Sequence, residues 1–173
     1  MDMPEAAAAQ SSQEFVLNRH IPAKQERVFS AFTQAEQLRQ WWGPKGFHST
    51  HCTLDLRRGG MMHYCIDGQG APVWGKWVIV ELLPPRRLGF IACFSDADAG
   101  EPTRHPQLAD WPRETMTEIE FRGQADGALL RVVSTPLNAT PAERRCFARH
   151  HDALDQGWSD TLDKLSEHLA RSA

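Results

Sequence analysis

The chain has 173 residues, of which 41% are apolar and 24% are charged, a balance typical of one globular domain. Its net charge of −3 gives no electrostatic basis for binding nucleic acid or an anionic membrane surface. No apolar stretch reaches the length of a membrane span. Residues 1–13 are rich in Ala and Gln and lack the cationic and apolar regions of a signal peptide, so we expect a disordered tail there.

Four cysteines stand far apart in the sequence, at positions 52, 65, 93 and 146, and none forms a C-x-x-C pair. Three of them fall in predicted strands and one in the last predicted helix. A disulfide framework is typical of short secreted chains. We therefore expect buried, reduced thiols and a cytoplasmic location.

The first elements are predicted to be one strand and two short helices. The strand covers 14–21 and ends at Pro22, and the first helix covers about 23–32. The second helix is predicted to begin with a capping box formed by Thr33 and Glu36, and to end before Gly43-Pro44.

The middle of the chain alternates strands with short turns. Its predicted strands cover 52–56, 61–66, 73–83, 88–95, 115–122 and 128–135. Residues 96–113 form a long segment rich in Pro, Asp and Gly, and long loops in compact domains are usually lids, binding loops or disordered. Trp111 is the candidate lid residue of this loop, with an isolated exposed Trp as the alternative.

The last element is predicted to be one amphipathic helix of roughly 40 Å. Thr140 and Glu143 form a capping box, with Pro141 at the first helical position. Trp158 lies near the centre of the apolar stripe, so we expect it to be buried between helix and sheet, while Gly157 suggests a close approach to a neighbour. The stripe follows helical spacing through Phe147, His151, Leu154, Trp158, Leu162, Leu165 and Leu169. An α+β fold results, with a long helix covering one face of an antiparallel sheet.

Four motifs in this order resemble a known superfamily. They are Pro22-Ala-Lys-Gln-Glu-Arg-Val-Phe29, Leu38-Arg-Gln-Trp-Trp-Gly-Pro44, the run of Gly59-Gly60, Asp67-Gly68, Gly75 and Pro84-Pro-Arg-Arg-Leu88, and Gly157-Trp-Ser-Asp-Thr-Leu-Asp-Lys-Leu165. The chain thereby resembles the START-like superfamily, also called SRPBCC or Bet v 1-like. Within it, the chain is similar to the family named for the activator of heat-shock-protein-90 ATPase, and the block at 134–140 is similar to a bacterial branch of that family.

The resemblance implies a helix-grip fold over residues 14–173 as a single domain. In this fold a curved antiparallel sheet of about six or seven strands surrounds a long C-terminal helix, and two short helices follow the first strand. An apolar cavity lies between sheet and helix. The resemblance implies no catalytic residue, because the superfamily includes lipid carriers, hormone-binding proteins, cyclases and proteins without an assigned activity.

Three functions remain open at this stage. The first is binding of a small, mostly apolar ligand, such as a lipid or an aromatic, polyketide-like molecule, in that cavity. The second is a co-chaperone of heat-shock protein 90, or a stress-response protein. The third is an enzyme of the polyketide cyclase or hydratase type. An enzyme is the less favoured reading, since no catalytic motif and no phosphate loop is present. No cofactor is implied, and a homodimer is left open.

Strand alternation and the helix stripe together predict which side chains line the cavity. Because Glu118, Glu120 and Arg131 suit the solvent face, their neighbours should point inward. For strand 61–66 both faces are apolar, so His63 and Tyr64 both remain candidates. The full set is Trp42, His63, Tyr64, Trp77, Ile79, Phe90, Trp111, Thr117, Ile119, Phe121, His151, Leu154 and Trp158.

Histidines could add polar chemistry to this apolar surface. His151 lies within the stripe, where a hydrogen-bonded core residue is the commoner role and a polar anchor for a ligand is the alternative. His48 and His51 form an H-x-x-H pattern on a strand, whose alternation should place them on opposite faces. We therefore expect no metal site.

Overall fold

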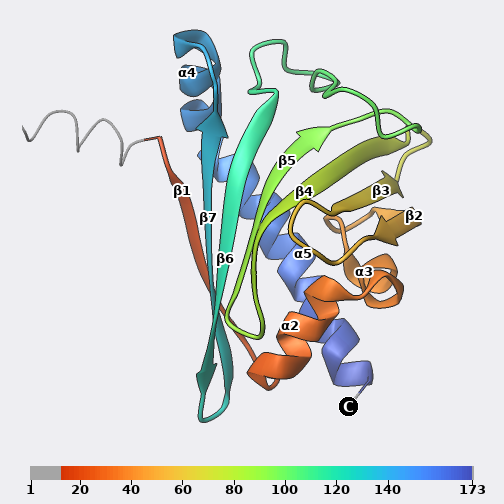
Figure 1. Cartoon of the computed structure of the whole chain (residues 1–173), viewed down its shortest axis with the longest axis vertical. Coiled ribbons are helices and arrows are strands. Elements are labelled where there is room, and N and C mark those ends of the chain that lie inside the picture. Colours follow the sequence, from red (N-terminus) through yellow and green to blue (C-terminus); the bar gives the residue numbers. More distant parts are fainter. Residues whose placement is uncertain (1–12, 173) are drawn as a thin grey trace, which may run out of the picture.

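Seven strands form one antiparallel sheet in the order β1-β7-β6-β5-β4-β3-β2 (Figure 1). The computed structural model describes residues 13–172, so the predicted tail lies, except for Gln13, outside the described residues. The strands are β1 (Phe15–Ile21), β2 (His48–Leu54), β3 (Met61–Asp67), β4 (Val73–Leu83), β5 (Arg87–Phe94), β6 (Glu114–Gln124) and β7 (Gly127–Leu137). The helices are α2 (Gln25–Thr33), α3 (Ala35–Trp41), α4 (Pro141–Arg149) and α5 (His151–Arg171).

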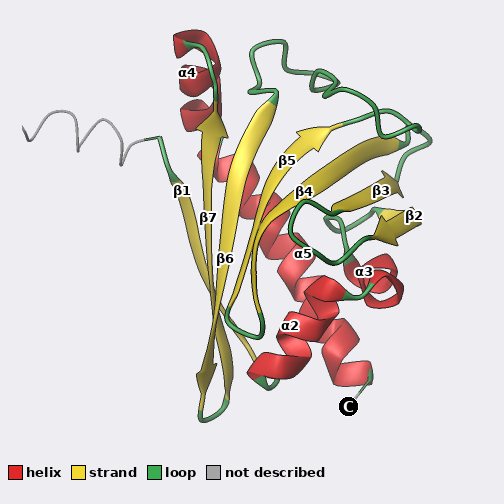
Figure 2. Cartoon of the chain, in the orientation of Figure 1, coloured by secondary structure: helices red, strands yellow, loops and turns green. Residues whose placement is uncertain are grey.

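The sheet curves around α5, which runs diagonally across its concave side, while α2 and α3 lie near the C-terminal end of α5 (Figures 1 and 2). Both short helices contact α5, and α2 also packs on β6 and α3 on β2. This arrangement confirms the predicted helix-grip fold, including the two short helices after the first strand. No helix among residues 13–172 is both long and apolar enough to cross a membrane.

Alternation along the central strands separates the core from the outer face, as the sequence predicts. The inward side chains of β4, β6 and β7 are buried: Trp77, Ile79, Thr117, Ile119, Phe121, Leu130 and Val132. Glu118 and Arg131 on the intervening positions are exposed. A pleated strand puts successive side chains on opposite faces, so one apolar set builds the core.

Strand β2 lies earlier in the chain than predicted. It covers His48–Leu54 rather than 52–56. The chain turns directly afterwards, where Asp55 N–H donates to the Met61 carbonyl and Gly60 N–H donates to the Arg57 carbonyl. A side chain at Gly60 would overlap the Asp55 carbonyl. Only glycine fits that turn, and its geometry ends β2 at Leu54.

The capping box predicted at Thr33 is wrong. Thr33 is buried, and its hydroxyl donates to the Phe29 carbonyl at 2.9 Å within α2. Helix α3 instead begins after Gln34, which makes no side-chain cap. Because Thr33 closes the last turn of the preceding helix, its oxygen does not reach the next one.

The single C-terminal helix of roughly 40 Å is also wrong, because the chain breaks at His150 into α4 and α5. The capping box at Thr140 is confirmed, with Glu143 N–H donating to the Thr140 hydroxyl at 3.2 Å. At the break, His150 N–H bonds the Phe147 carbonyl instead of the Cys146 carbonyl. The His150 Nδ1 atom lies 2.7 Å from that Cys146 oxygen and takes the place of the backbone donor. With 21 residues, α5 is about 32 Å long.

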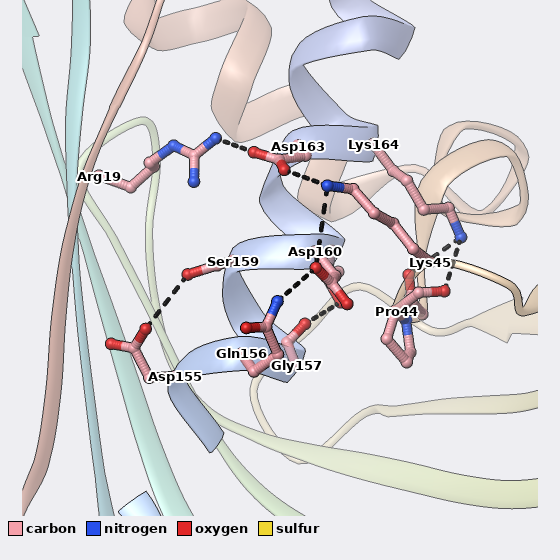
Figure 3. A network of polar contacts seen from close by, with 12 residues as sticks. Arg19, Pro44, Lys45, Asp155, Gln156, Gly157, Ser159, Asp160, Asp163 and Lys164 are labelled. Atoms are coloured by element: carbon pink, nitrogen blue, oxygen red, sulfur yellow. Dashed lines mark hydrogen bonds and ion pairs between the residues drawn. The ribbon is translucent and has the colours of Figure 1, made fainter. Parts of the chain in front are cut away.

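Polar contacts fasten α5 to the segment after α3 (Figure 3). The Lys164 ammonium donates to the Gly43 carbonyl at 2.9 Å and to the Phe47 carbonyl at 2.8 Å. On the same helix, Asp163 pairs with Arg19 of β1 and with Lys45, whose Nζ lies 2.6 Å from the carboxylate. These contacts hold the 43–47 segment and the first strand against the helix.

Replacing Lys164 should destabilise the protein more than replacing Lys45. A Lys164→Met change keeps the apolar stem but leaves two backbone carbonyls without their charged donor, so we expect a loss of about 1–3 kcal/mol. Lys45→Met breaks an ion pair whose lysine is 55% exposed, and solvent-exposed ion pairs contribute little to stability. Chemical denaturation of both variants measures the difference. An equal loss in the two would contradict this role for Lys164.

Candidate ligand-binding site

A cavity of about 420 Å³ lies between the concave face of the sheet and the first half of α5. Strands β3 to β7 form its floor, α5 forms its roof, and residues 42–44 after α3 form part of its rim. The loop between β5 and β6 reaches it through His105 and Trp111. The cavity therefore lies toward the end of the sheet that is away from α2.

Eight of the thirteen residues predicted to line the cavity border it. They are Trp42, Tyr64, Trp77, Phe90, Trp111, Thr117, Leu154 and Trp158. They come from α5, the sheet, the long loop and the segment after α3, and the fold brings them around one space. Binding of a ligand by these residues stays a prediction.

Three of the remaining five, Ile79, Ile119 and Phe121, are buried in closed core instead. The Phe121 ring meets Phe29 at 5.2 Å and Phe32 at 5.4 Å between ring centroids, both in edge-on contact. Helix α2 thus fills the space beside the sheet at this end of β6. Alternation predicts the inward face correctly but does not show where along the strand the space is filled.

His63 lies on the outer face of β3. Of the two candidates on this strand, Tyr64 is therefore the one that points inward and borders the cavity. His63 stacks on Trp74 with centroids 5.0 Å apart, and its Nε2 atom lies 3.0 Å from the Asp96 carbonyl oxygen. Lys76 binds the Ala99 carbonyl from the same face, at 3.2 Å. The start of the long loop therefore covers the outside of the sheet, which is why both faces of β3 are apolar.

His151 does not border the cavity. Its ring packs edge-on between Phe15 at 5.9 Å and Phe147 at 5.3 Å. The Nε2 atom is buried and has no hydrogen-bond partner among the described residues. Burial lowers the pKa of His151 below its ordinary value, which favours the neutral ring. With its ring between two phenylalanines and outside the cavity lining, His151 packs as an aromatic side chain.

Trp158 is half-buried rather than fully buried, because one side of it faces the cavity. Its ring meets Trp42 edge-on at 5.7 Å, and Trp42 in turn meets Trp77 at 4.8 Å and Tyr64 at 5.8 Å. We call these four side chains the aromatic cluster. They join the helix to the sheet across the edge of the cavity.

The expectation of a close approach at Gly157 is wrong. A Cβ atom built at Gly157 would meet no neighbour within 4 Å, and the residue borders the cavity. The missing side chain leaves open space under the helix. Glycine in a helix costs roughly 0.5–1 kcal/mol relative to alanine. Here that cost leaves room for the cavity and does not serve a tight contact.

The second half of the long loop borders the cavity through two aromatic side chains, those of His105 and Trp111. Trp111 packs on Phe147 at 5.4 Å, and His105 lies between Phe94 at 4.9 Å and Trp111 at 5.7 Å. The backbone N–H groups of residues 107 and 108 donate to His105 Nδ1 at 3.0 and 3.1 Å. This histidine orders the loop from within.

Several bordering residues escaped the sequence prediction. Phe94 and Ser134 lie on the inward faces of their strands and could have been found by extending the alternation. Phe147 belongs to the helix stripe. His105 carries no signal of its own, because an irregular loop has no period from which to infer a direction.

No residue of the described cavity lining is Asp, Glu, Lys or Arg. Burial raises the pKa of Tyr64 to about 12, so its phenol keeps its proton at neutral pH. Burial, and to a smaller extent the nearby His150, lowers the pKa of His105. The two N–H groups that donate to its Nδ1 atom also favour the neutral ring. The site is uncharged at neutral pH.

The H-x-x-H pattern on β2 departs from simple alternation. The pairing with β3 shifts between Ser49 and His51, so that His48 faces Asp67 and His51 faces Cys65. Those partners are two residues apart, so the bulge turns both histidines toward one face, contrary to expectation. Within residues 13–172, no group of three or more His, Cys, Asp or Glu side chains is placed to hold a metal ion.

Comparison with solved structures shows the same fold across several bacteria. A Mycobacterium smegmatis protein matches with a TM-score of 0.76 at 20% identity, covering 94% of each chain. A Nitrosomonas europaea protein matches at 0.74 and 20% identity, covering 94% of this chain and 97% of its own. An AHSA1 protein of Silicibacter pomeroyi matches at 0.66 and 23% identity, over 92% and 99%.

No curated protein matches the sequence. The family model described as activator of Hsp90 ATPase homolog 1-like protein matches residues 22–170. That range includes α2, α3, β2 to β7, α4 and nearly all of α5, and with them every element that borders the cavity. The chain belongs to the family of activator of Hsp90 ATPase homolog 1-like proteins.

Proposed function

We propose that the protein binds a small, mostly apolar molecule in the cavity under α5. The observation that carries the proposal is a space of about 420 Å³ bordered by aromatic side chains and by no charged one within the described residues. Ligand sites are typically clefts of roughly 300–1,000 Å³ with apolar linings and a few polar groups. A lipid or an aromatic molecule bound there would displace water and bury its apolar surface.

The loop between β5 and β6 supports this function as a cover over the cavity. Trp111 contacts α4 at Phe147 and the break at His150, and it borders the cavity at the same time. In this proposal a ligand enters by displacing this part of the loop, since the rings of His105 and Trp111 border the cavity. Trp111 thereby acts as the lid residue in the proposal.

Native mass spectrometry tests the binding function directly. The purified protein is mixed in turn with a panel of lipids and of aromatic polyketides, and the mass of each complex is recorded. We expect a one-to-one complex with at least one member of the panel. The absence of any complex across the panel would overturn the proposal.

Filling the cavity from Gly157 should block binding without harming the fold. A Gly157→Leu side chain would extend into open space, and the loss of a helical glycine is itself stabilising by roughly 0.5–1 kcal/mol. We expect at least tenfold weaker binding together with an unchanged or higher melting temperature. The matched control is Gln156→Leu, which adds the same side chain at an exposed neighbouring position. Full binding by Gly157→Leu would mean that the ligand lies elsewhere.

Trp158 should matter more for binding than for stability. A fully buried tryptophan typically costs about 3–5 kcal/mol when replaced by alanine, but Trp158 is only half-buried, so we expect about 1–3 kcal/mol for Trp158→Ala. Trp158→Phe should retain the fold and alter ligand affinity, because it keeps a ring in the aromatic cluster but changes its shape. Thermal denaturation and the binding assay measure the two effects. A Trp158→Ala protein that melts and binds like the wild type would contradict the placement of this ring.

Membership of the family supports a second candidate function, as a partner of heat-shock protein 90. The test measures ATP turnover by the chaperone with and without the protein. Under this function turnover changes in proportion to the protein added and saturates. Unchanged turnover at saturating protein would remove this candidate and leave the ligand-binding proposal intact.

A further inference from the structure

Two hydroxyl groups lie side by side on the floor of the cavity. Thr117 of β6 and Ser134 of β7 are directly paired across the two strands, and their oxygens are 2.8 Å apart. Both residues border the cavity, yet they are only 3% and 4% exposed. They place two adjacent hydroxyl groups within a mostly apolar floor.

Counting protons shows that this pair has one hydrogen-bond donor left over. Each hydroxyl carries one proton, so the pair carries two, and their mutual hydrogen bond engages one of them. Among the described residues the structure gives neither oxygen a second hydrogen bond. The hydroxyl of Thr161, across the cavity, is already engaged with the Gly157 carbonyl at 2.7 Å. A buried donor without an acceptor is unfavourable and rare, so the free proton favours an acceptor inside the cavity.

The surroundings of the pair restrict what can carry that acceptor. No lysine or arginine borders the cavity in the described chain, so an anion would lose its hydration without gaining a cationic partner. Phe90, directly opposite Thr117 on β5, stacks on Trp77 with centroids 4.0 Å apart and ring planes at 12°. This stacked pair borders the same floor and favours flat, apolar molecules.

We propose that the ligand is an uncharged, largely aromatic molecule whose carbonyl or ether oxygen accepts a hydrogen bond from the Thr117–Ser134 hydroxyl pair. The proposal rests on the binding function proposed above and adds to it a class of ligand and a polar anchor. Either residue can supply the proton, because the two hydroxyls exchange the roles of donor and acceptor in their mutual bond.

Three probes of one shape separate the elements of the proposal. 9-Fluorenone carries a carbonyl oxygen, fluorene replaces that carbonyl with a methylene group, and fluorene-9-carboxylate carries a charge at neutral pH. Dissociation constants are measured by equilibrium dialysis, with chromatography to quantify the free probe. For the wild type we expect the carboxylate to bind at least tenfold more weakly than 9-fluorenone.

Variants of the pair then test the anchor through the ratio of fluorene to fluorenone dissociation constants. In Thr117→Val or Ser134→Ala alone the remaining hydroxyl still has a free proton, so we expect the ratio to stay within about twofold of the wild type. In the double variant neither hydroxyl of the pair is left to donate, and we expect the ratio to fall about three- to tenfold, the range that one hydrogen bond supplies. Fluorene binding and the melting temperature, both little changed, control for the fold, because removing both polar partners together leaves neither unpaired.

The outcomes distinguish failure of this proposal from failure of the binding function. A double variant with the wild-type ratio would overturn the anchor while leaving the cavity as a binding site. Loss of the whole preference in one single variant would overturn the shared role of the two hydroxyls. Carboxylate binding as tight as fluorenone binding would overturn the uncharged class. Failure of all three probes to bind the wild type would count against the binding function and this proposal together.

Discussion

The structure depends on a helix that is packed along one half and held away from the sheet along the other. Leu162, Leu165 and Leu169 in the second half of α5 are buried against the sheet and the short helices. Leu154 and Trp158 in the first half are only half-buried, and Gly157 between them has no side chain. A curved sheet has more inner surface than one helix can cover, so space remains wherever a second layer is lacking. Helix α2 fills this space at one end of the sheet, and the cavity lies at the end that α2 does not cover.

The aromatic cluster maintains the separation on the open side. Trp42 stands between Trp158 on the helix and Trp77 and Tyr64 on the sheet, with edge-on contacts that keep the rings at fixed angles. Its position is fixed from behind, because the segment that follows it is bound by Lys164. Gly75 lies directly opposite Tyr64 on β4, and a side chain there would overlap the Tyr64 ring. The large rings of the aromatic cluster and the missing side chain of Gly75 together define the shape of the cavity edge.

The sequence predicted the elements of the fold well and the breaks between them less well. Period-2 and period-3.6 patterns report which face of an element is apolar, and they identified every strand and the inward sets on β4, β6 and β7. They do not report where a helix changes direction. His150 breaks the last helix through a contact of its own ring with the Cys146 carbonyl, and the apolar stripe continues across that break without interruption.

The same limit explains the errors in the predicted site. Alternation placed Phe121 and Thr117 on one face correctly, yet one side chain lies under α2 and the other in the cavity. That difference is set by tertiary packing, which acts between segments far apart in the chain. Gly157 is a second example, since a glycine in a helix is compatible both with a close contact and with open space. Only the surrounding geometry distinguishes the two.

The motifs that identify the family contribute unevenly to the cavity. The Trp-Trp-Gly-Pro motif supplies Trp42 and the rim beside it, and the Gly-Trp motif supplies Gly157 and Trp158 on the helix. Other motif glycines, such as Gly60, meet a backbone requirement away from the cavity. Thr117 on the floor lies outside all four motifs. The motifs thus supply part of the rim and of the helix side of the cavity, while Thr117, one half of the hydroxyl pair on the floor, lies outside them. Recognising the family therefore predicts the fold but not the contact between the two hydroxyl groups on the cavity floor.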